Sequence, residues 1–106
     1  MRQILNRYNG AVLLEVPGDS LIGANLRGCN LRGCDLSWSD LSGCDLRGCN
    51  LSGCNLSGCD LRWCNLTDAN LTGAILCYAN LSGADLTGAK LRGTIVTLGN
   101  RVVTLQ

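Results

Sequence analysis

The sequence predicts an all-β solenoid, in which the chain runs extended for a few residues, turns a corner and repeats. Leucine recurs at every fifth position from Leu21 to Leu91, and Val96 continues the phase. A period of five matches neither the 3.6-residue turn of an α-helix nor the two-residue alternation of a flat strand. Glycine recurs at the last position of most five-residue units and would cost a helix about 1 kcal/mol each time. Repetition at a fixed period indicates stacked units that bury their apolar sides only against one another.

Each unit places one long and one small side chain on the inner side of the chain. Two positions before each leucine from Leu26 onward the residue is small, as in Ala24, Cys29 and Cys34. The residue directly before the leucine is usually Asn or Asp, and the two that follow are mostly Arg, Ser or Thr and then Gly. We expect the leucine and the small residue to point inward together.

These residues, in the pattern A/C-N/D-L-x-x, resemble the pentapeptide repeat family over about residues 20 to 97. The resemblance implies a right-handed quadrilateral parallel β-helix with four units, or twenty residues, in each coil. The fifteen leucine-centred units from Leu21 to Leu91 would then make about four coils. Coils stacked about 4.8 Å apart, like neighbouring strands, would give a prism about 20 Å tall.

The length of 106 residues suffices for one domain, and we expect a single domain with a hairpin cap at each end of the solenoid. The expected parts are an N-terminal hairpin cap over residues 1–19, the solenoid over residues 20–97, and the end of a C-terminal cap hairpin over residues 98–106. Caps prevent the end-to-end association that an open solenoid edge invites.

Two dipeptides predict the turns of these hairpins. Asn9-Gly10 lies between the β-prone segments 3–8 and 11–16, and both turn residues tolerate positive φ. Gly99-Asn100 lies in the same way between segments 94–98 and 101–105.

Seven of the eight cysteines occupy the small inward position, where Ala, Ser39 or Thr94 stand in other units. These seven are Cys29, Cys34, Cys44, Cys49, Cys54, Cys59 and Cys64. A coil of twenty residues stacks Cys29 on Cys49, Cys34 on Cys54 and Cys44 on Cys64. Three interpretations are open: buried packing, a disulfide ladder, or a thiolate metal site.

Geometry favours packing. In-register neighbours place Cβ atoms about 4.8 Å apart, beyond the 3.5–4.5 Å that a disulfide spans. A tetrahedral site would need several thiolates converging at about 2.3 Å inside an apolar tube. We therefore predict no metal and no cofactor, with a Cys-lined, metal-binding solenoid as an alternative. Cys77 follows Leu76 and should lie outside, so it is the expected reactive thiol.

Residues twenty positions apart share a side of the solenoid, so the surface can be mapped from the sequence. The side built on Leu36, Leu56, Leu76 and Val96 gathers apolar groups at outward or corner positions. These candidate interaction residues are Trp38, Ile75, Cys77, Tyr78, Ile95 and Leu98. Clustered exposed apolar groups mark interfaces, although the C-terminal hairpin could instead fold back over part of this side.

Two further expectations concern the outer positions. Asn30, Asn50 and Asn70 share one side and are interpreted as an amide ladder. Four corners carry Trp38, Trp63, Asp68 and Tyr78 in place of glycine. Because such residues disfavour positive φ, we expect these corners to use a different turn.

Composition narrows the function classes. The chain has no histidine, which excludes His-based triads and His-containing metal sites. A net charge of +1 argues against binding nucleic acid or membrane surfaces through bulk electrostatics. The glycines follow the five-residue period and form no phosphate-binding motif, and a solenoid this narrow has no cavity for a small-molecule substrate. We predict that the protein is not an enzyme.

The prediction that remains is a structural or protein-interaction module that presents flat sides to an unknown protein partner or, as a homodimer, to a second copy. Some pentapeptide repeat proteins resemble B-form DNA in width and charge and act on DNA gyrase, so a DNA-mimicking gyrase-interacting protein is an alternative. The near-neutral charge departs from that acidic pattern. The N-terminal segment lacks signal-peptide features and no stretch is long enough to span a membrane, so we expect a cytoplasmic location.

Overall fold

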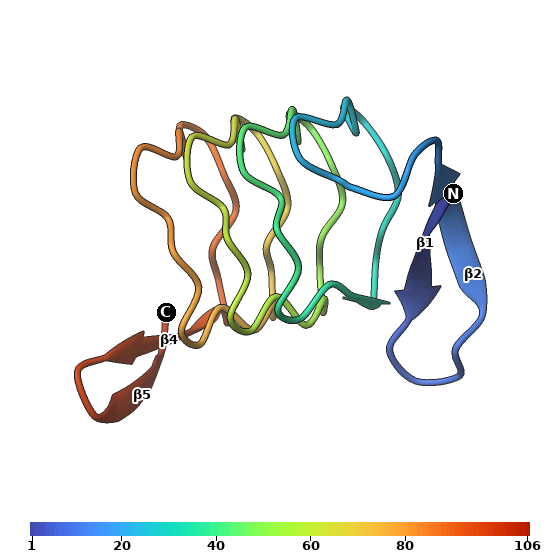
Figure 1. Ribbon diagram of the computed structural model, residues 1–106. Coiled ribbons are helices and arrows are strands. Elements are labelled where there is room, and N and C mark those ends of the chain that lie inside the picture. The colour runs from blue at the N-terminus through green and yellow to red at the C-terminus, as the bar shows by residue number, and fades with distance from the viewer.

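Each coil of the solenoid takes twenty residues, and the coils lie side by side along one axis (Figure 1). The computed structural model describes all residues from 1 to 106. Parallel bridges join residues twenty positions apart, from Asn25 with Asp45 to Ile75 with Ile95. The predicted quadrilateral parallel β-helix is confirmed.

The column of leucines fills the interior of the tube. Every repeat leucine from Leu21 to Leu76 exposes at most 4% of its surface, and the cysteines from Cys34 to Cys64 expose at most 1%. Burying a leucine side chain stabilises a fold by about 1.5–3 kcal/mol, so this column supplies much of the folding free energy. The predicted inward pairing of the leucine with the small residue is confirmed.

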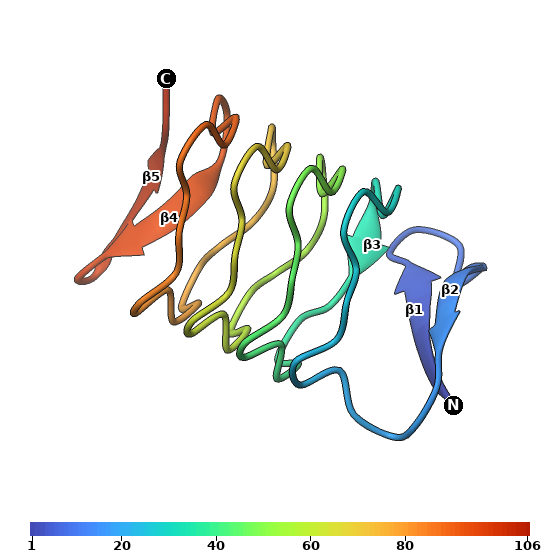
Figure 2. The same ribbon diagram turned by 90° about the horizontal axis from the view of Figure 1, so that it is seen from above.

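An antiparallel hairpin covers the N-terminal end of the solenoid. Its strands are β1 (Arg2–Asn6) and β2 (Val12–Val16), and β1 also pairs with β3 (Cys34–Asp35) of the first coil. Ile4 is fully buried in the same core cluster as the leucines, and Leu14 packs against that cluster. Figure 2 shows the hairpin lying against the first coil.

The turn of this hairpin is wider than the predicted Asn9-Gly10 pair, because residues 7–11 connect the two strands. The Asn6 side-chain oxygen accepts the N–H of Tyr8 at 2.8 Å and that of Asn9 at 3.2 Å, and these two bonds stabilise the start of the loop. Arg7 then reaches from the loop to the second coil, where its Nη1 donates to the Gly53 carbonyl at 2.9 Å.

The second predicted hairpin, around Gly99-Asn100, is also present but does not cover the end of the solenoid. Its strands are β4 (Ile95–Leu98) and β5 (Arg101–Thr104). Because β4 continues one side of the last coil, the hairpin extends that side and projects beyond the other three (Figure 1). The repeat leucines of the last coil are consequently only half-buried; these are Leu81, Leu86 and Leu91.

The prediction that corners without glycine use a different turn is wrong. φ is 62° at Trp38, 64° at Trp63, 60° at Asp68 and 62° at Tyr78, close to the 66° of Gly58. The reason is that hydrogen bonds to the next coil fix the backbone at these four corners. Trp38 donates its N–H to the Ser57 carbonyl at 2.8 Å, just as Gly58 donates to Cys77 at 2.8 Å. Each non-glycine corner therefore accepts a strain of roughly 1–2 kcal/mol.

The amide-ladder interpretation is also wrong. The Asn50 side-chain oxygen accepts the N–H of Ser52 at 3.1 Å, and that of Asn70 accepts the N–H of Thr72 at 3.0 Å. Each Asn or Asp before a leucine thus stabilises its own corner, as a residue in an Asx turn does.

Paired glycine substitutions test how the corners are packed. Gly53 and Gly58 share a φ of 66°, but a Cβ at Gly53 would meet open space whereas one at Gly58 would overlap the Trp38 indole. Gly53→Ala should lower the free energy of unfolding by about 1–2 kcal/mol, and Gly58→Ala should lower it further. Urea unfolding measures both values. Equal losses, or an excess that persists when Trp38→Ser is added, would contradict this packing.

Candidate interaction surfaces

The predicted interaction residues come together on one side of the solenoid and along its corner. Trp38 and Tyr78 occupy the same corner two coils apart and expose 74% and 70% of their surface, and Leu98, twenty residues after Tyr78 at the end of β4, exposes 64%. Ile75 and Ile95 are half-buried and bridge each other in neighbouring coils. We call the set the apolar side; it consists of Trp38, Ile75, Cys77, Tyr78, Ile95 and Leu98.

The C-terminal hairpin lengthens the apolar side and does not fold back over it. The Tyr78 N–H donates to Thr97 Oγ1 at 3.1 Å, which ties the corner to β4. On β5, Val102 pairs with Thr97 and exposes 65% of its surface. Sequence analysis missed Val102, although cross-strand partners in a hairpin share a face and the predicted turn would have placed it there.

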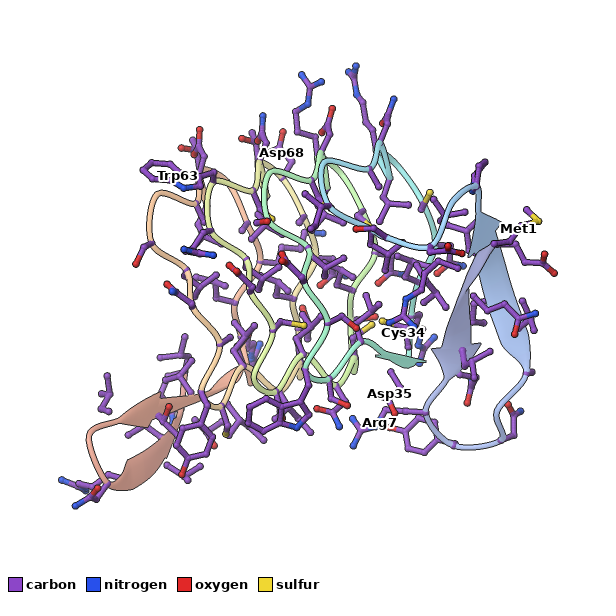
Figure 3. The ribbon with its side chains drawn as sticks, viewed as in Figure 1. Met1, Arg7, Cys34, Asp35, Trp63 and Asp68 are labelled. Atoms are coloured by element: carbon purple, nitrogen blue, oxygen red, sulfur yellow. The ribbon has the colours of Figure 1, made fainter.

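Trp63 lies outside the apolar side. Figure 3 shows it at the edge of the solenoid opposite Asp35 and Arg7. Its exposure of 71% and its φ of 64° nearly equal those of Trp38. Its ring covers Gly83 in the next coil in the way that the Trp38 ring covers Gly58. The two indoles therefore have the same local geometry in different surroundings.

The buried thiols serve as hydrogen-bond donors to the backbone. Cys54 Sγ donates to the Leu31 carbonyl at 2.7 Å and Cys64 Sγ to the Leu41 carbonyl at 2.9 Å, in each case 23 residues earlier. Thr94 Oγ1 makes the equivalent bond to Leu71 at 2.8 Å. The Leu31, Leu41 and Leu71 carbonyls already accept the backbone N–H of the residue three positions later, so each thiol or hydroxyl adds a second hydrogen bond to its carbonyl.

The cysteine stacks form pairs and not converging clusters. Cys34 Sγ lies 2.8 Å from Cys54 Sγ, and no three or more Cys, Asp or Glu side chains gather as a metal site. Burial raises the pKa of Cys49 to about 12 and that of Cys59 to about 12. The hydrogen bond with Cys54, and then burial, raise the pKa of Cys34. Protonated thiols are poor metal ligands, which disfavours Cys34, Cys49 and Cys59 in that role. The hydrogen bonds with Cys64 and Cys34 instead lower the pKa of Cys44 and that of Cys54.

Cys29 differs from the other inward cysteines because it is half-buried, as is Cys77. Cys29 belongs to the first coil, and the N-terminal hairpin pairs with that coil only at β3, near Cys34. Two thiols, Cys29 and Cys77, are therefore accessible, where the sequence predicted Cys77 alone.

Two ion pairs form within single units of the solenoid. Arg47 Nη2 lies 2.6 Å from Asp45 Oδ2, and Arg62 Nη2 lies 2.6 Å from Asp60 Oδ2. The Arg47 guanidinium lowers the pKa of Asp45 to about 2. Because the partners are two residues apart, each pair lies on one side of the solenoid. The structure also contains no helix with the length and hydrophobicity that crossing a bilayer requires.

Comparison with known proteins agrees with this geometry. The family model described as pentapeptide repeats (8 copies) matches residues 20–58 and again residues 54–93. The chain belongs to the pentapeptide repeat family. No match was found among curated proteins.

Two solved pentapeptide repeat proteins resemble this one. The protein alr5209 of Nostoc PCC 7120 is 47% identical over 71% of this chain, with a TM-score of 0.69. HetL of Nostoc sp. strain PCC 7120, which is involved in heterocyst differentiation regulation, is 31% identical over 73% of this chain, with a TM-score of 0.50. The matches cover 63% and 53% of those two chains, so this pentapeptide repeat protein spans less than two thirds of either relative.

Thiol titration tests the environment of the cysteines in this pentapeptide repeat protein. A thiol reagent should modify Cys29 and Cys77 in the folded protein and the other six only after denaturation. Cys29→Ser and Cys77→Ser should each remove one fast-reacting thiol. Three or more fast thiols, or fewer than eight after denaturation without reductant, would show that the interior differs from the one described.

The raised thiol pKa values predict a loss of stability in alkali. An unfolded thiol titrates at its ordinary pKa of 9.0, whereas Cys49 and Cys59 titrate at about 12 when folded. Stability should therefore hold below pH 9 and fall between about pH 9 and 12, by up to about 1.4 kcal/mol per pH unit for each thiol.

Urea unfolding at several pH values measures this slope. The matched control is the Cys49→Ala, Cys59→Ala double variant, since alanine fills the same position in other units, as at Ala69 and Ala74. Its alkaline slope should be shallower than that of the unmodified protein. An unchanged slope would show that groups other than these two thiols cause the loss of stability in alkali.

Proposed function

We propose that this pentapeptide repeat protein is a non-catalytic scaffold that binds protein through its apolar side. The proposal is carried by the large exposed side chains Trp38 and Tyr78 at one corner, by the exposed Leu98 at the end of β4, and by the half-buried Ile75 and Ile95. Clusters of exposed apolar residues mark protein interfaces, and tryptophan and tyrosine supply much of the binding energy in such interfaces.

The chemistry of the remaining side chains supports a role without catalysis. The thiols that could act as nucleophiles are mostly buried, and several donate hydrogen bonds to backbone carbonyls, as Cys54 and Cys64 do. The carboxylates of Asp45 and Asp60 are bound by Arg47 and Arg62. A general base or an activated nucleophile needs a free group beside a partner that tunes it.

A DNA-mimicking role toward gyrase has less support. A protein that imitates a duplex must present a dense array of negative charge. Here the acidic and basic side chains number eight and nine, and two of the carboxylates are neutralised within their own units. We therefore favour an apolar over an electrostatic mode of docking.

A second copy of the chain is the first partner to test. Size-exclusion chromatography with light scattering should show a mass that rises with concentration toward that of a dimer. The Tyr78→Ser, Leu98→Ser double variant should weaken the association by about 30-fold or more, because hot-spot residues contribute at least about 2 kcal/mol. Trp63→Ser, which changes an equally exposed indole outside the apolar side, should behave as the unmodified protein.

The experiments test the homodimer and the protein-binding role of the apolar side separately. A monomer at all concentrations would overturn the homodimer. Photo-crosslinking from position 102 on β5 in cell extract would then compare the unmodified protein with the double variant. The same crosslinked products from both would overturn the apolar side as a protein-binding surface.

A further inference from the structure

The Cys34 thiol is the one fully buried thiol that donates to another sulfur and not to a backbone carbonyl. Thiols that donate to carbonyls are those of Cys44, Cys49, Cys54, Cys59 and Cys64. For Cys54 the accepting carbonyl, that of Leu31, lies 23 residues earlier in the preceding coil. The equivalent residue for Cys34 is Ala11, which belongs to the hairpin loop and whose carbonyl accepts the Asn6 N–H at 2.7 Å. Because no coil precedes it, Cys34 Sγ donates to Cys54 Sγ.

The Cys34 and Cys54 sulfurs are close to bonding geometry. Their Sγ atoms lie 2.8 Å apart, against about 2.0 Å in a disulfide. The two residues are twenty positions apart in adjacent coils, so strand spacing places their Cα atoms about 4.8 Å from each other. A disulfide spans Cα separations of about 4.4–6.8 Å. Strictly parallel side chains would keep the strand spacing, whereas these two lean toward each other and leave the sulfurs a short movement from a bond.

Cys54 has the surroundings of an attacking thiol. Its Sγ accepts the Cys34 thiol at 2.8 Å and the Cys34 N–H at 3.2 Å. These hydrogen bonds, together with the charge of Arg7, lower the pKa of Cys54, although burial opposes them. Arg7 is held in place by its 2.9 Å hydrogen bond to the Gly53 carbonyl. The thiolate is the nucleophile in disulfide chemistry, and nearby cations and hydrogen-bond donors favour it.

The N-terminal hairpin controls access to this pair. Both cysteines are fully buried, and Cys34 lies on the side of the solenoid that carries Arg7 and Asp35 (Figure 3). The hairpin pairs with β3 at only two positions, Leu5 with Asp35 and Asn6 with Cys34. Short pairings at the end of a structure open locally at a lower cost than the stacked interior does. A small reagent can therefore reach the two sulfurs when the hairpin opens, without unfolding of the coils.

We propose that Cys34 and Cys54 form a disulfide between the first two coils by exchange with a low-molecular-weight disulfide such as oxidised glutathione. The Cys54 thiolate attacks one glutathione sulfur, which forms a mixed disulfide and releases a glutathione thiolate. Cys34 then attacks the Cys54 sulfur, the second glutathione leaves, and its thiolate takes the Cys34 proton. Two protein thiols are thereby oxidised and one glutathione disulfide is reduced to two thiols.

The bond would fasten the first coil, and with it the strand that the hairpin pairs with, to the second coil. A disulfide stabilises mainly by constraining the unfolded chain, and a loop of this length should raise the midpoint of thermal unfolding by about 10 °C. The Cys44–Cys64 stack is the matched comparison, because both of its thiols donate to carbonyls and neither lies in β3.

Thiol counting after oxidation tests the proposal. The Cys29→Ser, Cys77→Ser background removes the two accessible thiols, which would bind glutathione themselves, and leaves six of the eight cysteines. The folded, reduced protein is incubated with excess oxidised glutathione, then denatured and alkylated, and its mass is measured. Four thiols should remain, with no bound glutathione and a mass lower by two hydrogen atoms before alkylation. Cys34→Ala and Cys54→Ala should each abolish the intramolecular bond, whereas Cys44→Ala should leave it.

Alanine occupies the same inward position at Ala69 and Ala74, so these variants should fold, and circular dichroism checks that they do. Six free thiols after incubation, or a loss of two that persists in Cys34→Ala, would overturn the proposal. Glutathione that stays attached to Cys54 would overturn the second exchange step, and a lower thermal midpoint of the oxidised protein would show that the sulfurs are not placed for a bond. The proposal is independent of binding through the apolar side, which is tested at Tyr78 and Leu98.

Discussion

The whole structure depends on the backbone hydrogen bonds that join each coil to the next. Leu46 donates to the Asn65 carbonyl at 2.8 Å, and Asp45 donates to the Ala24 carbonyl at 3.0 Å, so the coil is bonded along both of its edges. Position within the twenty-residue coil therefore fixes which side a residue occupies and whether it points inward. The same bonds hold a corner in the left-handed conformation even where tryptophan replaces glycine. Strain at Trp38 and Trp63 is small beside the hydrogen bonds that a different turn would break.

The position of the cysteines in the repeat lowers their reactivity. Seven cysteines sit in stacked positions, yet buried ones such as Cys64 donate to a carbonyl, and burial keeps Cys49 and Cys59 protonated near neutral pH. The Thr94 hydroxyl donates the same kind of hydrogen bond to a backbone carbonyl. The thiols thus act mainly as small hydrogen-bonding core residues, and any activity of this protein belongs to its surface.

The surface gains its distinct features where the repeat is interrupted. A regular solenoid presents flat sides, whereas the aromatic corners and the two hairpins create contours on them. The N-terminal hairpin closes one end, while β4 and β5 lengthen the apolar side and leave the last coil open.

The sequence by itself determined the repeat and the inward pairing of leucine with a small residue, since both follow from a strict five-residue period. Turn dipeptides indicated the two hairpins, and the twenty-residue coil that the family resemblance implies placed the rows of residues that share a side. Only the tertiary structure decided the turn at Trp38, the half-buried state of Cys29, the direction of the C-terminal hairpin and the contact between the Cys34 and Cys54 sulfurs. These features arise from contacts between segments far apart in the chain, and local propensity, which disfavours tryptophan at positive φ, points the wrong way when hydrogen bonds from a neighbouring coil outweigh it.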